Sequence, residues 1–107
     1  MKKGDIVLIP FPFTDLTGNK LRPALVLVAT KVDVTVAFIT TQIRWKESHD
    51  IILTATKQNG LKQESLVRLA KLATIDSNLV DGILGDVGES TVHEINQNLI
   101  IILKLDE

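Results

Sequence analysis

The residues best suited to chemistry lie where polar and apolar stretches of the chain meet. In the segment GNKLRPALVLVATK, residues 18–31, Arg22 stands directly before a proline and an apolar run. A later apolar run ends in Thr40 and Thr41. If the two runs form neighbouring antiparallel strands, the end of the second lies near the start of the first, so Arg22 comes close to both threonines. A guanidinium fork beside hydroxyl donors suits a phosphate, so this pattern indicates an anion site.

The same residues also have a purely structural interpretation. An arginine at the mouth of a strand can donate to the carbonyl groups of a turn, and threonine is common in strands for packing reasons. The spacing of Arg22 and Thr40 alone therefore leaves both interpretations open.

Short strands and one terminal helix must position these side chains. Apolar runs separated by turn residues predict strands over residues 5–10, 23–29, 34–40, 50–53, 65–67 and 69–75, and a further extended segment over 81–86. A long loop is expected between the first two strands, and a short helical turn capped by Ser77 after the last long one. Helical spacing predicts a helix over residues 89–104, with Ser90 or Thr91 as its N-cap and Glu94 completing a capping box. The β-branched run of residues 100–102 is also compatible with a strand.

These elements predict a fold that is mainly β with helices. Several short strands, tight turns and one terminal helix are typical of a small, partly open β-barrel with a helix packed on it. A length of 107 residues without repeats or linkers predicts one domain over residues 1–107.

Composition excludes several classes of chemistry. Hydrophobic residues make up 45% of the chain, which is enough to bury a core. There is no cysteine, so neither a disulfide framework nor a thiolate metal site is possible, and only two histidines are present. The sequence therefore predicts no bound metal and no cofactor. No apolar stretch approaches the roughly 20 residues of a membrane helix, and the N-terminus lacks the apolar region of a signal peptide, which predicts a cytoplasmic protein.

The charges are unevenly distributed along the chain. Residues 1–71 carry 11 Lys and Arg against 6 Asp and Glu, whereas residues 72–107 carry one Lys against 7 acidic residues. A polyanion bound to one face would suit this asymmetry, but a solvated surface can reach it by chance.

Four stretches taken in order carry a resemblance to a known family. The segments GDIVLIPFPF, KLRPALVL, VAFITTQI and GLKQESLVRLAKLATID resemble the MazF/PemK toxins of bacterial toxin–antitoxin systems, over nearly the whole chain. The resemblance implies an SH3-like β-barrel with a C-terminal helix that forms a homodimer. It also implies metal-independent endoribonuclease activity on single-stranded RNA, with cyclic phosphate and 5′-hydroxyl ends, and inhibition by a cognate antitoxin protein. Contact with DNA is implied only indirectly, through the antitoxin.

The resemblance assigns catalytic roles to the residues singled out first. Thr40 matches the catalytic threonine of the family, with Thr41 as a secondary candidate, and Arg22 matches its arginine. Because arginine stays protonated in proteins, stabilisation of the pentacoordinate phosphate is the role that best suits Arg22, although the family often assigns it acid–base work as well.

The loop before Arg22 departs from the family pattern. Some members carry a glutamate five residues before the arginine, as a candidate base, and Thr17 stands there in this chain. Asp15 is the nearest acid and a secondary catalytic candidate, but its position in a polar loop favours the interpretation as a solvated carboxylate. The missing glutamate supports an alternative in which the protein binds antitoxin or nucleic acid without cleavage. We expect the loop from Phe11 to Leu21 to be mobile and to border the RNA groove.

Other side chains are candidates for RNA binding. Trp45 stands between two cations and either stacks a base or covers the end of the barrel or the dimer interface. Lys71, where many family members have glutamine, either contacts the RNA backbone or faces water. The full set of predicted RNA-binding residues is Lys20, Gln42, Arg44, Trp45, Ser65 and Lys71.

Overall fold

The computed structural model describes residues 1–11 and 20–107, and the described residues form six strands, two short 3₁₀ helices and one α-helix. The elements in chain order are β1 (Asp5–Phe11), β2 (Lys20–Ala29), β3 (Asp33–Thr40), η1 (Ile43–Trp45), β4 (Ile51–Leu53), β5 (Ser65–Asp76), η2 (Ser77–Leu79), β6 (Gly82–Asp86) and α1 (Gly88–Ile102).

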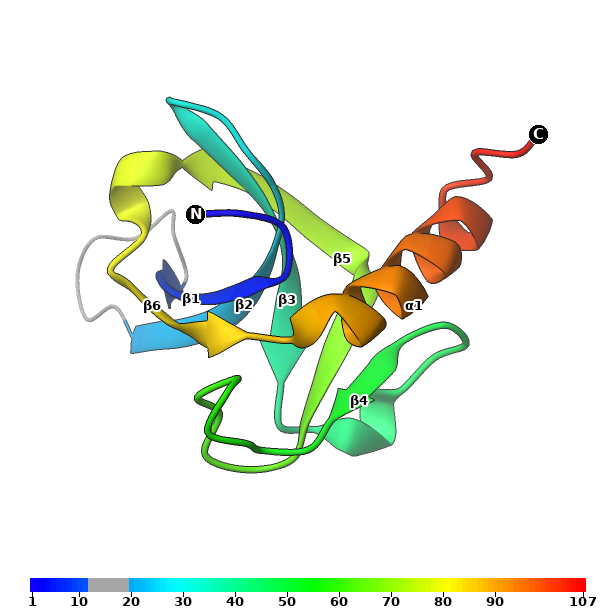
Figure 1. Cartoon of the computed structure of the whole chain (residues 1–107), viewed down its shortest axis with the longest axis horizontal. Helices are drawn as coiled ribbons and strands as arrows, with labels where there is room; N and C mark the ends of the chain where they lie inside the picture. Colours follow the sequence, from blue (N-terminus) through cyan, green and yellow to red (C-terminus); the bar gives the residue numbers. More distant parts are fainter. Residues whose placement is uncertain (12–19) are drawn as a thin grey trace.

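The strands form a single antiparallel sheet that curls into a half-barrel, with α1 lying across it (Figure 1). The strand order is β4-β5-β3-β2-β1-β6. The central strands β3 and β2 therefore have neighbours on both sides, and β4 and β6 lie at the two edges. The predicted mainly-β fold, a partly open barrel with a C-terminal helix, is confirmed.

Both faces of the sheet are buried over part of their area, which explains the nearly continuous apolar runs in the sequence. Alternate residues of each strand point to opposite faces. Residues on one face pack with α1 into the first core: Ile6, Leu25, Ala37, Ile39, Ile51, Leu53, Val67, Leu69, Ile95 and Leu99. Residues on the other face fill the inside of the curl as the second core: Val7, Ile9, Ala24, Val26, Val34, Val36 and Ile75.

The same alternation fixes the face on which the candidate catalytic residues lie. Arg22 is two residues from Ala24 on β2, and Thr40 is four residues from Val36 on β3, so both belong to the face of the second core. This is the sheet face opposite to the one that packs against α1.

Two predicted strand boundaries are wrong around the first loop. β1 continues through Pro10 to Phe11, and β2 already begins at Lys20, where Phe11 and Lys20 are paired. Arg22 is consequently the third residue of its strand, paired with Ile9, rather than the residue before the strand. The centre of the predicted mobile loop, residues 12–19, lies outside the described residues.

The two strands expected over residues 65–75 are one continuous strand. β5 runs from Ser65 to Asp76, but its pairing with β3 shifts abruptly: Ala37 faces Leu72, whereas the next residue, Phe38, faces Arg68. The three β5 residues between these partners form an irregularity of the kind that bends a strand and redirects its side chains.

The predicted helix caps are also corrected. α1 starts at Gly88, and its N-cap is Val87, with no capping side-chain hydrogen bond, so Ser90 and Thr91 lie inside the helix. Asp86 partly caps the helix instead, because its Oδ1 accepts a hydrogen bond from the backbone N–H of Gly88 at 3.0 Å. In the short turn, Asp76 rather than Ser77 caps η2, by accepting from the backbone N–H of Asn78. No helix within residues 1–11 and 20–107 is long and apolar enough to cross a membrane.

Candidate active site

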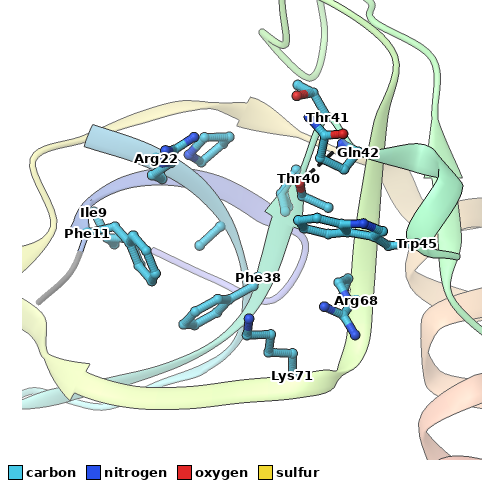
Figure 2. Close-up of a pocket in the computed structure, with 13 residues that line it drawn as sticks. Ile9, Phe11, Arg22, Phe38, Thr40, Thr41, Gln42, Trp45, Arg68 and Lys71 are labelled. Carbon is cyan, nitrogen blue, oxygen red and sulfur yellow. Dashed lines mark hydrogen bonds between the residues drawn. The ribbon is translucent and has the colours of Figure 1, made fainter. Parts of the chain in front are cut away.

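A pocket of about 400 Å³ opens on the sheet face opposite α1 (Figure 2). Its wall comes from β1, β2, β3, β5 and the segment around η1. The described lining residues are Ile9, Phe11, Arg22, Pro23, Ala24, Phe38, Ile39, Thr40, Thr41, Gln42, Trp45, Arg68 and Lys71. The pocket thus brings together six of the residues that the sequence proposed for catalysis or RNA contact: Arg22, Thr40, Thr41, Gln42, Trp45 and Lys71.

Arg22 and Thr40 lie at the same end of the β2–β3 pair. The last paired residues at this end are Ala24 on β2 and Phe38 on β3, and Arg22 and Thr40 each lie two residues beyond them. Both side chains line the pocket. The Thr40 Oγ1 accepts a hydrogen bond from the backbone N–H of Gln42 at 3.1 Å. This contact orients the hydroxyl group and leaves its proton available for donation into the pocket.

The pocket is cationic. Arg22, Arg68 and Lys71 line it, and no carboxylate belongs to the part of its wall that the structure describes. The Lys71 Nζ lies 5.4 Å from the centre of the Phe38 ring, and Phe11 packs edge-on against the same ring at 5.8 Å. Aromatic walls beside several cations form a surface suited to an anion that carries flat rings.

Trp45 lies at the end of the short helix η1 and contributes to the pocket wall, with 49% of its surface exposed. The Arg44 guanidinium carbon lies 5.9 Å from the centre of its indole ring. An indole at the rim of a cationic pocket, half open to solvent, is placed for a base to stack on.

Three of the other predicted residues lie apart from the pocket. Ser65 is 2% exposed, and its hydroxyl donates to the carbonyl of Gln63 at 2.9 Å. Lys20 and Arg44 are exposed, but neither belongs to the pocket lining. Asp15, the candidate base, lies outside the described residues.

Sequence reasoning missed Arg68 and Phe38 as site residues. Phe38 lies between apolar neighbours on β3 and has the pattern of an ordinary core side chain. Arg68 could have been found from the sequence, because it is a single cation inside the apolar run SLVRL. A charge in such a run needs either a hydrogen-bond acceptor or access to solvent. Its acceptor is Glu47, whose Oε1 lies 3.1 Å from the Arg68 Nη2.

A buried carboxylate fixes the segment that carries Trp45. Asp50 is 6% exposed. One of its oxygens accepts from the backbone N–H of Glu47 at 3.0 Å, and the other accepts from the backbone N–H of Leu69 at 3.1 Å. Asp50 thereby ties the chain following η1 to β5 at the point where β5 becomes irregular, and so holds two parts of the pocket wall together.

Asp50→Asn should destabilise the protein by about 1–3 kcal/mol, because the amide NH₂ replaces one acceptor and leaves a buried backbone N–H without a partner. Chemical denaturation followed by circular dichroism measures the change. The matched control is Asp81→Asn, at an exposed position, which should change stability by less than about 0.5 kcal/mol. Equal effects of the two substitutions would contradict the role given to Asp50.

The described part of the chain offers no ready set of metal ligands at this site. Among residues 1–11 and 20–107, no group of three or more His, Cys, Asp or Glu side chains is placed to hold a metal ion. The polar groups that the pocket does present are cations, hydroxyls and one amide, which suit a phosphate rather than a metal.

Comparison with known families identifies the family of this chain. The chain belongs to the PemK-like, MazF-like toxins of type II toxin–antitoxin systems, whose family model matches residues 2–103. The resemblance noted in the sequence is thereby confirmed. No curated protein matches the chain in sequence.

Several solved structures share the fold. The Mycobacterium tuberculosis toxin MazF-mt6 is 25% identical, with a TM-score of 0.78 over 96% of this chain and 99% of that one. A mycobacterial endoribonuclease solved in complex with its cognate antitoxin is 20% identical, with a TM-score of 0.75 over 98% and 96% of the two chains. MazF from Deinococcus radiodurans is 18% identical, with a TM-score of 0.74 over 97% and 96%.

Proposed function

We propose that this protein is a metal-independent endoribonuclease toxin that cleaves single-stranded RNA at short sequences and is neutralised by a cognate antitoxin. The observation that carries the proposal is the pocket that joins Arg22 and Thr40 with two further cations. Family membership agrees with it, since structural relatives include endoribonucleases.

The proposed reaction uses the 2′-hydroxyl of the RNA as nucleophile. Its oxygen attacks the adjacent phosphorus, the bond to the 5′-oxygen of the next nucleotide breaks, and a 2′,3′-cyclic phosphate and a 5′-hydroxyl result. Negative charge grows on the non-bridging oxygens as the pentacoordinate phosphate forms. The Arg22 guanidinium stabilises this charge, and the Thr40 hydroxyl donates to one of those oxygens. Asp15 remains the candidate base that accepts the 2′-hydroxyl proton, and the departing 5′-oxygen takes up a proton from solvent water to become the 5′-hydroxyl.

Specificity for single strands follows from the aromatic side chains. A base must leave its stack to lie on the Trp45 ring, and an unpaired strand permits this at little cost. Thr41, Gln42 and Lys71 extend the polar lining on either side of Thr40 and contact the neighbouring nucleotides. Lys20, Arg44 and Ser65 are retained as weaker RNA-binding candidates outside the pocket.

The expected partners follow from the toxin–antitoxin assignment. A cognate antitoxin, acidic and folding as it binds, would compete with RNA for the cationic pocket. DNA would be contacted only through that antitoxin. A toxin acting on RNA made in the cell would work in the cytoplasm.

Homodimer formation is part of this proposal. Near the end of α1 the apolar residues Ile100, Ile101, Leu103 and Leu105 are 42–65% exposed, which is a large apolar area for a helix end. Light scattering at micromolar concentration should give twice the 11.8 kDa of one chain. A species of 11.8 kDa alone would contradict the dimer.

Incubating the purified protein with a long RNA in EDTA tests the activity. Cleavage that persists in EDTA and disappears when antitoxin is added supports the proposal. Binding of the RNA without any cut would support the alternative, a silent family member, for which Thr17 in place of the loop glutamate is the supporting feature.

A further inference from the structure

One cation of the pocket is already paired in the free protein. The Arg68 Nη2 contacts the Glu47 Oε1 at 3.1 Å, with the Arg68 side chain 24% exposed and the Glu47 side chain 70% exposed. The arginine is therefore anchored in the pocket wall, whereas the carboxylate reaches it from solvent. Glu47 itself is not among the residues that line the pocket.

We propose that Arg68 is a second phosphate-binding residue of this pocket, and that Glu47 occupies its guanidinium until an RNA phosphate replaces it. The inference rests on the proposed function, because it assigns a second subsite for the same RNA. The inference also gives Glu47 a role, because its carboxylate competes with the RNA phosphate for Arg68 and so lowers RNA affinity.

Strand positions separate the two arginines. Arg22 is on β2 and Arg68 on β5, with β3 between them. Two strand spacings amount to about 10 Å. Figure 2 shows Arg22 at one side of the pocket and Arg68 at the other. Because the two arginines lie on different sides of the pocket, we assign them to different phosphates of one strand.

The side chains between the two arginines suit the nucleotide that would connect those phosphates. In Figure 2 Thr40 and Trp45 lie between Arg22 and Arg68. A strand whose reacting phosphate lies at Arg22 and Thr40 would pass the indole ring before its next contact. Trp45 would then stack a base while Arg68 holds a phosphate beyond it.

Arg68 retains donors for a new acceptor. A guanidinium has five N–H donors in a planar fork that matches carboxylate and phosphate alike. Among the described contacts Glu47 uses only the Nη2 group, so other N–H groups of the fork remain for a second acceptor. An under-satisfied guanidinium at a pocket wall favours an incoming anion.

Exchange of the carboxylate for a phosphate is favourable on charge grounds. An ion pair with an exposed partner contributes little to stability, so Glu47 is released at small cost. A phosphate in the pocket also gains the nearby ammonium of Lys71, which lines the same wall. The loop does not depend on the ion pair, because Asp50 already holds the backbone of Glu47.

The inference is tested by measuring how tightly the protein binds a short, mixed-sequence RNA that carries 2′-O-methyl groups. Such an RNA is not cleaved, because its nucleophilic hydroxyl is blocked. Affinity is measured over a series of salt concentrations for wild type, Arg68→Gln, Glu47→Gln and the double variant. The control is Lys31→Gln, which removes one positive charge in the turn between β2 and β3, at the opposite end of β3 from Thr40.

Arg68→Gln should weaken binding about tenfold at low salt, as the loss of a charge-assisted contact does, and reduce the slope of log affinity against log salt by about 0.7. Glu47→Gln should tighten binding by about 2–5-fold, the strength of an exposed ion pair. In the Arg68→Gln background, Glu47→Gln should have a much smaller effect. Lys31→Gln should leave both the affinity and the slope nearly unchanged.

Glu47→Gln and Arg68→Gln test the inference independently of the proposed function. Glu47 is exposed, so Glu47→Gln remains a valid test even if Arg68→Gln misfolds by circular dichroism. Unchanged or weaker binding by Glu47→Gln would overturn the competitor role, and an Arg68→Gln variant that folds and binds like wild type would overturn the subsite. If unmodified RNA is bound with the predicted variant effects but never cut, the proposed function fails while the inference stands.

Discussion

Arg22→Ala is expected to reduce RNA cleavage below detection, a loss of at least about 10³-fold, as for other arginines that stabilise a phosphoryl transition state. This large loss is expected because of where Arg22 lies in the pocket. Arg22 and Thr40 line one pocket whose described wall holds no carboxylate, so in the proposed reaction the developing charge lies beside the guanidinium. Initial rates on a substrate with one mapped cut site provide the measurement.

Two controls separate this catalytic role from stability. Arg22 is an exposed residue of β2, so the alanine variant should keep the circular dichroism spectrum and thermal midpoint of wild type. Arg22→Lys keeps the charge but loses the planar fork, and should recover only part of the rate. A folded Arg22→Ala variant that cuts at the wild-type rate would show that the site has been wrongly assigned.

Thr40→Val is expected to slow cleavage by about 10²–10³-fold, the usual loss when one preorganised donor to a developing oxyanion is removed. Valine keeps the shape of the side chain but removes the hydroxyl. It also removes the acceptor of the Gln42 backbone N–H, so a small loss of stability accompanies the loss of rate.

Serine at the same position distinguishes the two effects. Thr40→Ser keeps both the donor and the acceptor and should retain most of the activity. Thr41→Val should slow the reaction less than Thr40→Val, because Thr41 lies one residue beyond the end of β3. If Thr41→Val has the larger effect, the wrong threonine has been chosen.

Much of the architecture was predictable from apolar patterning. Runs such as residues 24–29 and 34–40 specified central strands, and their antiparallel pairing brought Arg22 and Thr40 into one pocket, as expected. The position of Arg22 relative to its strand was wrong because pairing with β1 extends β2 to Lys20. The residues of the turn do not indicate this pairing, because the hydrogen bonds that extend β2 are made with the partner strand β1.

The unpredicted parts of the site depend on contacts distant in sequence. Arg68 reaches the pocket where β5 shifts its pairing with β3, an irregularity that no local pattern specifies. Its partner Glu47 lies 21 residues away in the chain. The start of α1 differed because Asp86, rather than a residue of the expected capping box, meets the Gly88 N–H.

The central claim is that the 2′-hydroxyl next to the scissile phosphate cuts the RNA in the pocket of Arg22 and Thr40. A direct measurement compares an RNA carrying one mapped cut site with the same RNA carrying a single 2′-deoxynucleotide on the 5′ side of the scissile bond. The account predicts cleavage of the first to a 2′,3′-cyclic phosphate and a 5′-hydroxyl, and no cleavage of the second at that bond. Cleavage of the deoxy-substituted bond, or a 5′-phosphate on the product, would contradict it.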